Sequence, residues 1–201
     1  MTGVDKHMTG VVLCGGQSHR MGVDKGLIKL SANTWAGKAA ATIAALPLPV
    51  VVSVNPGQYN SYSTIFPRAQ LIPDHESLSI KGPLCGVLSV HLQDPSADLL
   101  VLACDMPLMD TSLLRELVQH YQNNRASDAW VFHSGSEWEP LCGIYAAKAL
   151  ATILQMLRTN QLPKFSMKYM LEQINTFSIP IQPAQEKYFH NINSPDELNG
   201  Q

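Results

Sequence analysis

A pair of glycines and two cationic residues stand close together near the start of the chain. Residues 9–25 read TGVVLCGGQSHRMGVDK, and the apolar run VVL predicts a strand that ends at Gly15 and Gly16. Residues without a β-carbon let backbone N–H groups approach an anion, and Arg20 and Lys25 add positive charges nearby. The combination predicts a phosphate-binding loop, whereas the glycines alone would more often mark an ordinary strand-to-helix turn.

Asp105 follows a second apolar run, DLLVLA at residues 98–103, which is typical of a strand buried on both faces. A carboxylate directly after such a strand points into the crevice where open α/β sheets bind ligands. It is also the ligand that Mg²⁺ prefers beside phosphate oxygens. From position alone a turn or a helix cap explains Asp105 equally well, because Asp before Met-Pro is common in turns.

A third group consists of Asp74, Gly82 and Gly86, in a loop that leads into a predicted helix. Two glycines four residues apart, the second entering the helix, suggest close approach of a ligand to a helix N-terminus. A plain loop-to-helix junction explains them nearly as well. The seven histidines form no HxH or HExxH spacing, so the histidine pattern gives little support to a zinc site.

Alternating strands and helices must position these residues. The predicted strands are residues 11–13, 50–54, 69–72, 98–103, 129–133, 138–145, 177–179 and 189–192. The predicted helices are one capped by Thr34, residues 84–92, one opened by Thr111 or Ser112, residues 147–157 and 165–171, and a last one capped at Ser194. This alternation predicts an α/β fold with a mostly parallel sheet, helices on both faces and ligands at the carboxyl ends of the strands.

Composition limits the class of protein. The 201 residues fit a single domain, 45% of them are hydrophobic, 15% are charged, and the net charge is −2. These values argue against a disordered tail and against a broad nucleic-acid surface, so we expect small-molecule partners. No apolar run approaches the roughly 20 residues that span a bilayer, and the first residues lack the apolar core of a secretory signal. We therefore expect a cytoplasmic protein without a membrane partner.

The four cysteines, Cys14, Cys85, Cys104 and Cys142, are far apart in sequence and form no CxxC pair. Their apolar or glycine-rich surroundings favour small core residues. Cys14 and Cys104 could be neighbours at the ends of adjacent strands. A cysteine-based metal or redox protein is therefore a minor alternative.

The loop LCGGQSHRMGVDKG at residues 13–26 resembles the signature loop of the molybdenum cofactor guanylyltransferases, members of the nucleotide-diphospho-sugar transferase superfamily. That loop reads roughly LAGG, a few polar residues, RMG and DK. Cys14 replaces the usual alanine with a side chain of similar small size. The string CDMP at 104–107 resembles the family's CDxP motif, and residues 74–86 resemble its D…GPLxG segment. Matching pieces extend from residue 13 to residue 198, nearly the whole chain.

The resemblance implies a Rossmann-like three-layer α/β/α fold of the nucleotide-diphospho-sugar transferase type. It implies a nucleotide-binding half at about residues 9–110 and a molybdopterin-binding half at about 111–198. In this interpretation Asp105 binds Mg²⁺ and the nucleotide phosphates, while Lys25 and Arg20 neutralise charge during catalysis. The positions that the resemblance implies for nucleotide binding are Leu13, Cys14, Gly15, Gly16, Lys25, Asp74, Gly82, Gly86 and Asp105.

Further positions match the family in part. The segment VVVSVNPGQ places Ser53 and Asn55 where the enterobacterial form of the family has two asparagines. Serine is shorter and lacks the paired groups of an amide, so Asn55 could share the nucleotide contact. The segment NINSPDEL resembles the family's NxNTPxEL, which implies that Asn191 and Asn193 face the active site from its far side, although turn capping also explains them. Residues 139–141 resemble a segment of the second-substrate half.

The implied reaction is transfer of GMP from GTP to the terminal phosphate of molybdopterin, with release of pyrophosphate. An anionic phosphate nucleophile needs no strong general base, so positioning and charge stabilisation can supply the catalysis. In the superfamily that this loop resembles, LAGG accompanies guanine and LAAG accompanies cytidine or thymidine nucleotides, so the resemblance of LCGG with Gly15 implies guanine. The alternatives are a cytidylyltransferase for molybdopterin or another phosphorylated acceptor, and a non-catalytic module that senses GTP or carries the finished cofactor. The expected partners are GTP, molybdopterin and proteins of molybdopterin synthesis or molybdoenzymes.

Overall fold

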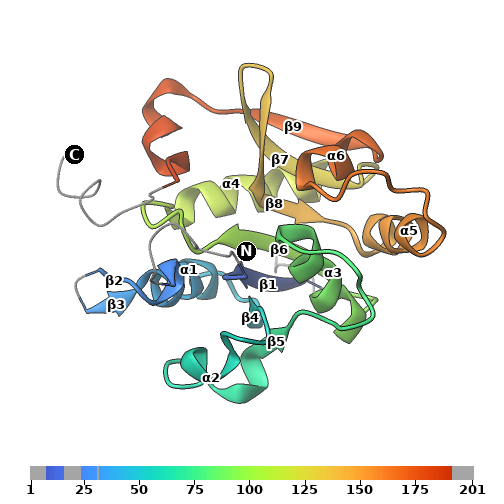
Figure 1. The fold of residues 1–201 in the computed structure, drawn as a ribbon. Helices are drawn as coiled ribbons and strands as arrows, with labels where there is room; N and C mark the ends of the chain where they lie inside the picture. The colour runs from blue at the N-terminus through green and yellow to red at the C-terminus, as the bar shows by residue number, and fades with distance from the viewer. Residues whose placement is uncertain (1–7, 16–23, 31, 192–201) are drawn as a thin grey trace.

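A mixed β-sheet forms the middle layer of the molecule in a computed structural model that describes residues 8–15, 24–30 and 32–191 (Figure 1). Within these residues the sheet has seven strands in the order β5-β4-β1-β6-β8-β7-β9. Strand β8 is antiparallel to its neighbours β6 and β7, and the other adjacent pairs are parallel. The strands are β1 (Met8–Leu13), β4 (Val50–Val54), β5 (Leu71–Pro73), β6 (Asp98–Ala103), β7 (Ala129–Ser134), β8 (Glu137–Tyr145) and β9 (Thr176–Pro180). The predicted α/β fold with a mostly parallel sheet is confirmed.

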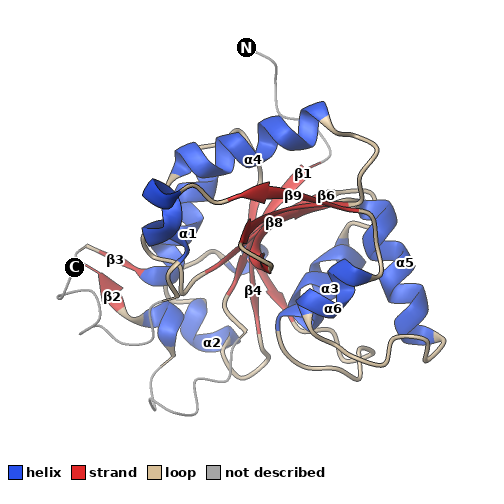
Figure 2. Ribbon diagram, turned by 90° about the horizontal axis from the view of Figure 1, so that it is seen from above, coloured by secondary structure: helices blue, strands red, loops and turns tan. Residues whose placement is uncertain are grey.

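The central strands are apolar because helices cover the sheet on both sides. Val11 and Val12 are neighbours in β1 that point to opposite faces, and both are completely buried. Helices α1 (Trp35–Ala44) and α4 (Thr111–Asn123) cover one face. Helices α3 (Pro83–Gln93), α5 (Ala147–Arg158) and α6 (Met167–Glu172) cover the other (Figure 2).

The first crossover shows how local sequence directs the fold. The Thr34 hydroxyl accepts a hydrogen bond from the Gly37 N–H at 3.1 Å, which caps α1 as predicted. Trp35 and Ile43 of α1 are completely buried against the sheet. The chain then returns as β4, parallel to β1, so the predicted strand-helix-strand unit is present.

Short elements account for the differences from the predicted boundaries. Strand β5 begins at Leu71 because Arg68–Gln70 form a 3₁₀ turn, and α6 begins after Ser166, whose hydroxyl accepts from the Tyr169 N–H. A strand at 189–192 is wrong as far as the structure describes it: Phe189 ends the 3₁₀ helix Pro183–Phe189 and packs on Phe132. The predicted cap at Ser194 lies outside the described residues. Further short elements are the 3₁₀ helix Lys25–Leu27, β2 (Lys29–Leu30), β3 (Asn33–Thr34) and α2 (Tyr59–Tyr62).

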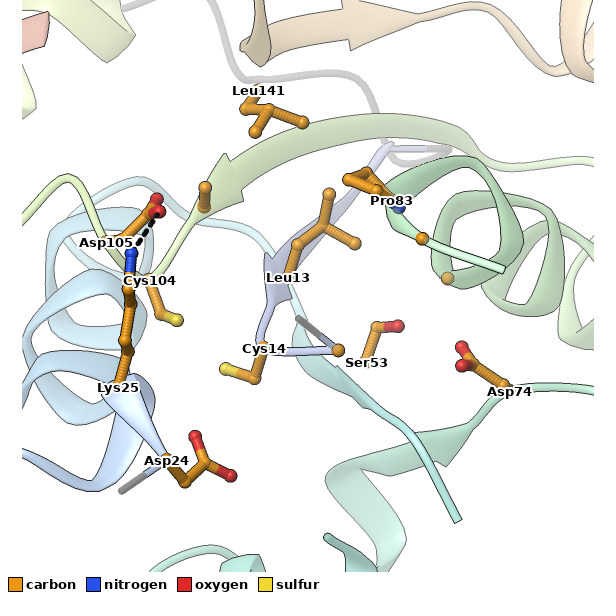
Figure 3. A pocket seen from close by; sticks show the side chains of 14 residues that line it. Leu13, Cys14, Asp24, Lys25, Ser53, Asp74, Pro83, Cys104, Asp105 and Leu141 are labelled. Atoms are coloured by element: carbon orange, nitrogen blue, oxygen red, sulfur yellow. Dashed lines mark ion pairs between the residues drawn. The ribbon is translucent and has the colours of Figure 1, made fainter. Parts of the chain in front are cut away.

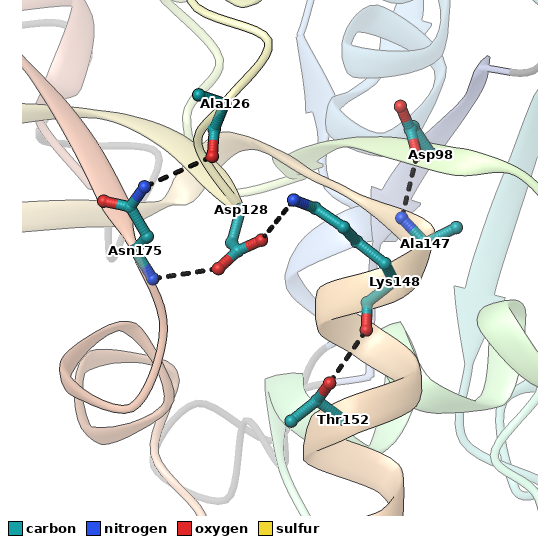
Figure 4. A network of polar contacts seen from close by, with 7 residues as sticks. All are labelled: Asp98, Ala126, Asp128, Ala147, Lys148, Thr152 and Asn175. Atoms are coloured by element: carbon teal, nitrogen blue, oxygen red, sulfur yellow. Dashed lines mark hydrogen bonds and ion pairs between the residues drawn. The ribbon is translucent and has the colours of Figure 1, made fainter.

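A polar network fixes the later elements at the edge of the sheet where β6 begins (Figure 4). The Asp98 carboxylate accepts a hydrogen bond from the Ala147 N–H at 2.8 Å, at the start of α5. Asp128 accepts one from the Asn175 N–H at 3.1 Å and lies 2.9 Å from the Lys148 ammonium. This network holds the starts of α5, β7 and β9 together. It lies at the amino end of β6, whereas the candidate site lies at the carboxyl end of that strand. No helix in the described part of the chain is long and apolar enough to cross a membrane.

Candidate functional site

A pocket of about 180 Å³ opens at the carboxyl ends of β1, β4 and β6 (Figure 3). Most of the residues predicted to bind nucleotide lie around it, although they come from segments as far apart as the end of β1 and the residues that follow β6. The lining consists of Leu13, Cys14, Gly15, Asp24, Lys25, Ser53, Asp74, Gly82, Pro83, Gly86, Ala103, Cys104, Asp105 and Leu141. A pocket therefore exists at the carboxyl ends of the strands, where the sequence predicts that ligands bind.

Backbone hydrogen bonds continue the strand pairing beyond β1 and β6. The Cys14 N–H donates to the Ser53 carbonyl at 2.9 Å, and the Cys104 N–H donates to the Leu13 carbonyl at 3.1 Å. Cys14 and Cys104 are therefore neighbours, and contact with the Cys14 thiol together with burial raises the pKa of Cys104. Both are buried free thiols, as predicted for small core residues.

Lys25 and Asp105 face each other across one side of the pocket. The Lys25 ammonium lies 3.8 Å from Oδ2 of Asp105, and their side chains are 22% and 25% exposed. Oδ1 of Asp105 is buried without a hydrogen-bond partner. Burial raises the pKa of the Asp105 carboxyl, and the nearby Lys25 charge opposes that shift. The pair therefore offers both a cation for phosphate and an unused carboxylate oxygen.

The chemistry of this side fits a divalent cation that is held jointly with phosphate. The unpartnered oxygen of Asp105 is a hard ligand of the kind that Mg²⁺ takes from proteins. Among the described residues no group of three or more His, Cys, Asp or Glu could hold a metal ion alone. Asp105 would therefore hold such a cation as a single carboxylate ligand, an arrangement common for Mg²⁺ that binds together with substrate phosphates.

The opposite side of the pocket combines Asp74, Ser53 and the start of α3. Oδ1 of Asp74 and the Ser53 hydroxyl are buried without partners. Burial raises the pKa of Asp74, against an opposing effect of the Cys85 thiol. Gly82 has φ +88° and precedes α3 without a side-chain cap, and a β-carbon on Gly86 would lie 2.5 Å from the Ser53 hydroxyl oxygen. Both glycines are therefore needed for this wall to have its shape.

A wider cavity of about 700 Å³ adjoins the pocket through Gly15, Asp74 and Gly82. Asn55 lines this second cavity, and its side-chain oxygen accepts a hydrogen bond from the Gln58 N–H at 3.1 Å. Ser53 and Asn55 are thus separated, with the serine in the first pocket and the asparagine in the second.

The remaining predicted residues lie elsewhere. Gly16, Arg20 and Asn193 are outside the described residues, and Asn191 is exposed at the end of the last described segment. Glu139 lines a separate cavity beside His190, whereas Leu141, two residues along β8, lines the main pocket.

Asp24 is a pocket residue that the sequence prediction did not select, although it belongs to the DK pair of the loop. Its carboxylate accepts hydrogen bonds from Tyr62 and Gln58, which are distant in sequence. The DK pair of the loop motif could have identified Asp24 as a site residue. No local sequence pattern identifies Gln58 or Tyr62 as residues that contact the site.

The chain matches the family model described as MobA-like NTP transferase domain over residues 10–174. A probable molybdenum cofactor guanylyltransferase of Flavobacterium johnsoniae is 30% identical over 192 residues, which cover 96% of this chain and 95% of that protein. A probable molybdenum cofactor guanylyltransferase of Trichormus variabilis is also 30% identical, over 96% of this chain and 89% of its own length.

Solved structures share the fold. Molybdopterin-guanine dinucleotide biosynthesis protein A of Archaeoglobus fulgidus superposes with a TM-score of 0.77 at 22% identity, over 96% of each chain. A Mycobacterium tuberculosis protein solved as a complex with manganese has a TM-score of 0.63 at 10% identity, over 96% of this chain and 97% of its own. With the family match covering most of the sequence, the chain belongs to the MobA-like NTP transferases and is a nucleotidyltransferase.

Proposed function

We propose that this chain transfers GMP from GTP to the terminal phosphate of molybdopterin, forming the molybdopterin guanine dinucleotide cofactor and pyrophosphate. The names of the similar curated proteins support this reaction. The observation that carries it is the buried, unpartnered oxygen of Asp105 beside Lys25, in the pocket that begins at Gly15. In one partly buried pocket, the ammonium can bind the phosphates of a nucleoside triphosphate and the carboxylate can bind the metal cation that accompanies them.

The residues can promote the transfer without a general base. The attacking group is a phosphate that is already anionic, so catalysis requires alignment and neutralisation of charge. Lys25 would lie against the phosphates, together with Arg20 from the same predicted loop. Asp105 would hold Mg²⁺, which supplies additional neutralisation of the phosphate oxygens when it is bound.

Asp74 supports guanine as the base. An ionised carboxylate only accepts hydrogen bonds, and guanine presents two adjacent N–H donors at its N1 and N2 positions. Cytosine places an acceptor next to its amino group and would leave one carboxylate oxygen opposed to a lone pair. The unpartnered Oδ1 of Asp74 and the hydroxyl of Ser53 are both available in the pocket for such contacts.

The test measures pyrophosphate released by the purified protein with Mg²⁺, molybdopterin and either GTP or CTP. GTP should be the better donor, and Asp105→Asn should reduce its transfer rate at least a hundredfold while the far-ultraviolet circular dichroism stays unchanged. Asp110→Asn is the matched control, because Asp110 is an exposed helix cap and asparagine caps helices equally well.

An unchanged rate in Asp105→Asn would contradict the assignment of Asp105. A preference for CTP would identify a cytidylyltransferase instead. Tight GTP binding by the wild-type protein without pyrophosphate release would show a binding module.

A further inference from the structure

Two polar side chains at the ends of the short helix α2, the N-cap residue Gln58 and the last residue Tyr62, contact Asp24 of the main pocket. The Tyr62 hydroxyl donates a hydrogen bond to Oδ1 of Asp24 at 2.8 Å, and the Gln58 amide donates to Oδ2 of Asp24 at 2.6 Å. The Gly26 N–H also donates to Oδ1 of Asp24, at 3.1 Å. Both carboxylate oxygens of Asp24 are therefore held by protein donors.

Gln58 also contacts the other end of the predicted phosphate loop. Its amide nitrogen donates to the Cys14 carbonyl at 3.0 Å as well as to Asp24. The orientation of this amide is fixed, because its oxygen accepts a hydrogen bond from the Asn55 N–H at 2.9 Å. One side chain thus connects the residue before Gly15 with the residue before Lys25.

The fit around Tyr62 leaves little freedom. Its side chain is completely buried, and a β-carbon on Gly26 would lie 2.0 Å from its hydroxyl oxygen. Burial, with smaller contributions from Cys14, Cys104 and Asp24, raises the pKa of the Tyr62 phenol. The hydroxyl therefore stays protonated and remains a donor to Asp24.

Asp24 determines how Lys25 enters the pocket. Its side chain caps the 3₁₀ helix Lys25–Leu27, so the direction of that turn depends on where the carboxylate is held. Lys25 then reaches to 3.8 Å from Asp105. A displacement of Asp24 would move the ammonium away from the phosphate position without removing any group that touches the substrate.

We infer that Gln58 and Tyr62 are positioning residues of this site, which act through Asp24 to place Lys25 against the nucleotide phosphates. This inference rests on the proposed binding of a nucleoside triphosphate in the pocket. It assigns Asp24 to the support of Lys25, since its two oxygens already accept three hydrogen bonds from the protein. None of the α2 residues lines the main pocket, so α2 contributes to the site only through this support of Asp24.

The test uses Tyr62→Phe, which removes the hydroxyl and keeps the buried ring. The affinity for GTP with Mg²⁺ is measured by calorimetry, without an acceptor, for the wild-type protein and for Lys25→Ala, each with and without Tyr62→Phe. We expect Tyr62→Phe to weaken GTP binding about tenfold when Lys25 is present, the effect of losing a charge-assisted hydrogen bond. In the Lys25→Ala background it should change the affinity less than twofold.

Tyr59→Phe is the matched control, because it removes a hydroxyl from the same helix outside this network, and it should leave the affinity unchanged. An equal loss of affinity in both Lys25 backgrounds would show a general structural role and overturn the inference, as would no loss in either. A wild-type protein that binds GTP but transfers nothing to molybdopterin would disprove the proposed reaction and leave this comparison intact.

Discussion

Replacing Gly86 with alanine should expose a specific steric conflict between α3 and β4. The new β-carbon would lie 2.5 Å from the Ser53 hydroxyl oxygen and 3.2 Å from a methyl carbon of Leu13. The first distance is too short for any real contact, and Ser53 is completely buried. The serine or the helix must therefore move.

Two opposing effects set the magnitude. Overpacking of a well-packed interior costs about 1–3 kcal/mol, whereas alanine is favoured over glycine inside a helix by about 1 kcal/mol. We expect Gly86→Ala to lower the free energy of unfolding by about 1 kcal/mol in the wild-type background. In Ser53→Ala the hydroxyl is absent, and the nearest Ser53 atom is its β-carbon at 3.5 Å, an ordinary contact. There only the Leu13 methyl at 3.2 Å, the end of a flexible side chain, must shift, so Gly86→Ala should raise the free energy of unfolding by about 0.5–1 kcal/mol.

The assay is urea denaturation of the four proteins of this double-mutant cycle, followed by tryptophan fluorescence and circular dichroism. The Ser53 hydroxyl has no hydrogen-bond partner, so Ser53→Ala alone should change stability by less than about 1 kcal/mol. The expected interaction between the two substitutions is about 1.5–2 kcal/mol. If Gly86→Ala has the same effect in both backgrounds, the clash with Ser53 does not exist and the account of this wall is refuted.

Two further predictions concern pH and have opposite signs. Burial raises the pKa of Asp74, so at pH values above the unfolded-state pKa of about 3.9 the ionised carboxylate destabilises the folded state. Asp74→Asn removes this charge and should raise the melting temperature by about 2 °C at pH 7 and by less at pH 4, where the carboxyl is partly protonated. A lower melting temperature at pH 7 would contradict this. Burial lowers the pKa of His91, against the attraction of Asp94, so the wild-type protein should lose up to about 1.4 kcal/mol of unfolding free energy per pH unit below about pH 6.5. His91→Gln should remove that part of the slope in urea denaturation measured from pH 7.5 to 5; an identical slope would show that His91 is not its source.

The amino-acid sequence by itself determined the architecture and one side of the site. Apolar runs predict β1, β4 and β6 because strands covered on both faces need apolar side chains at every position. The cap at Thr34 is equally local, since its hydroxyl reaches a backbone N–H only three residues away. Its place directly after a buried strand puts Asp105 at the carboxyl edge of the sheet, but a turn residue would fit there equally well, and the resemblance of CDMP to a family motif was needed to select it.

Only the tertiary structure decided how these residues are supported. Gln58 and Tyr62 lie 34 and 38 positions from Asp24, at the N-cap and the last residue of a helix too short to have a recognisable apolar period. Phe189 looked like part of a strand, but packing on Phe132 places it at the end of a 3₁₀ helix. Local patterns record which side chains must be buried or must cap a turn. Which distant polar groups meet depends on how the buried faces pack together, and no single segment contains that information.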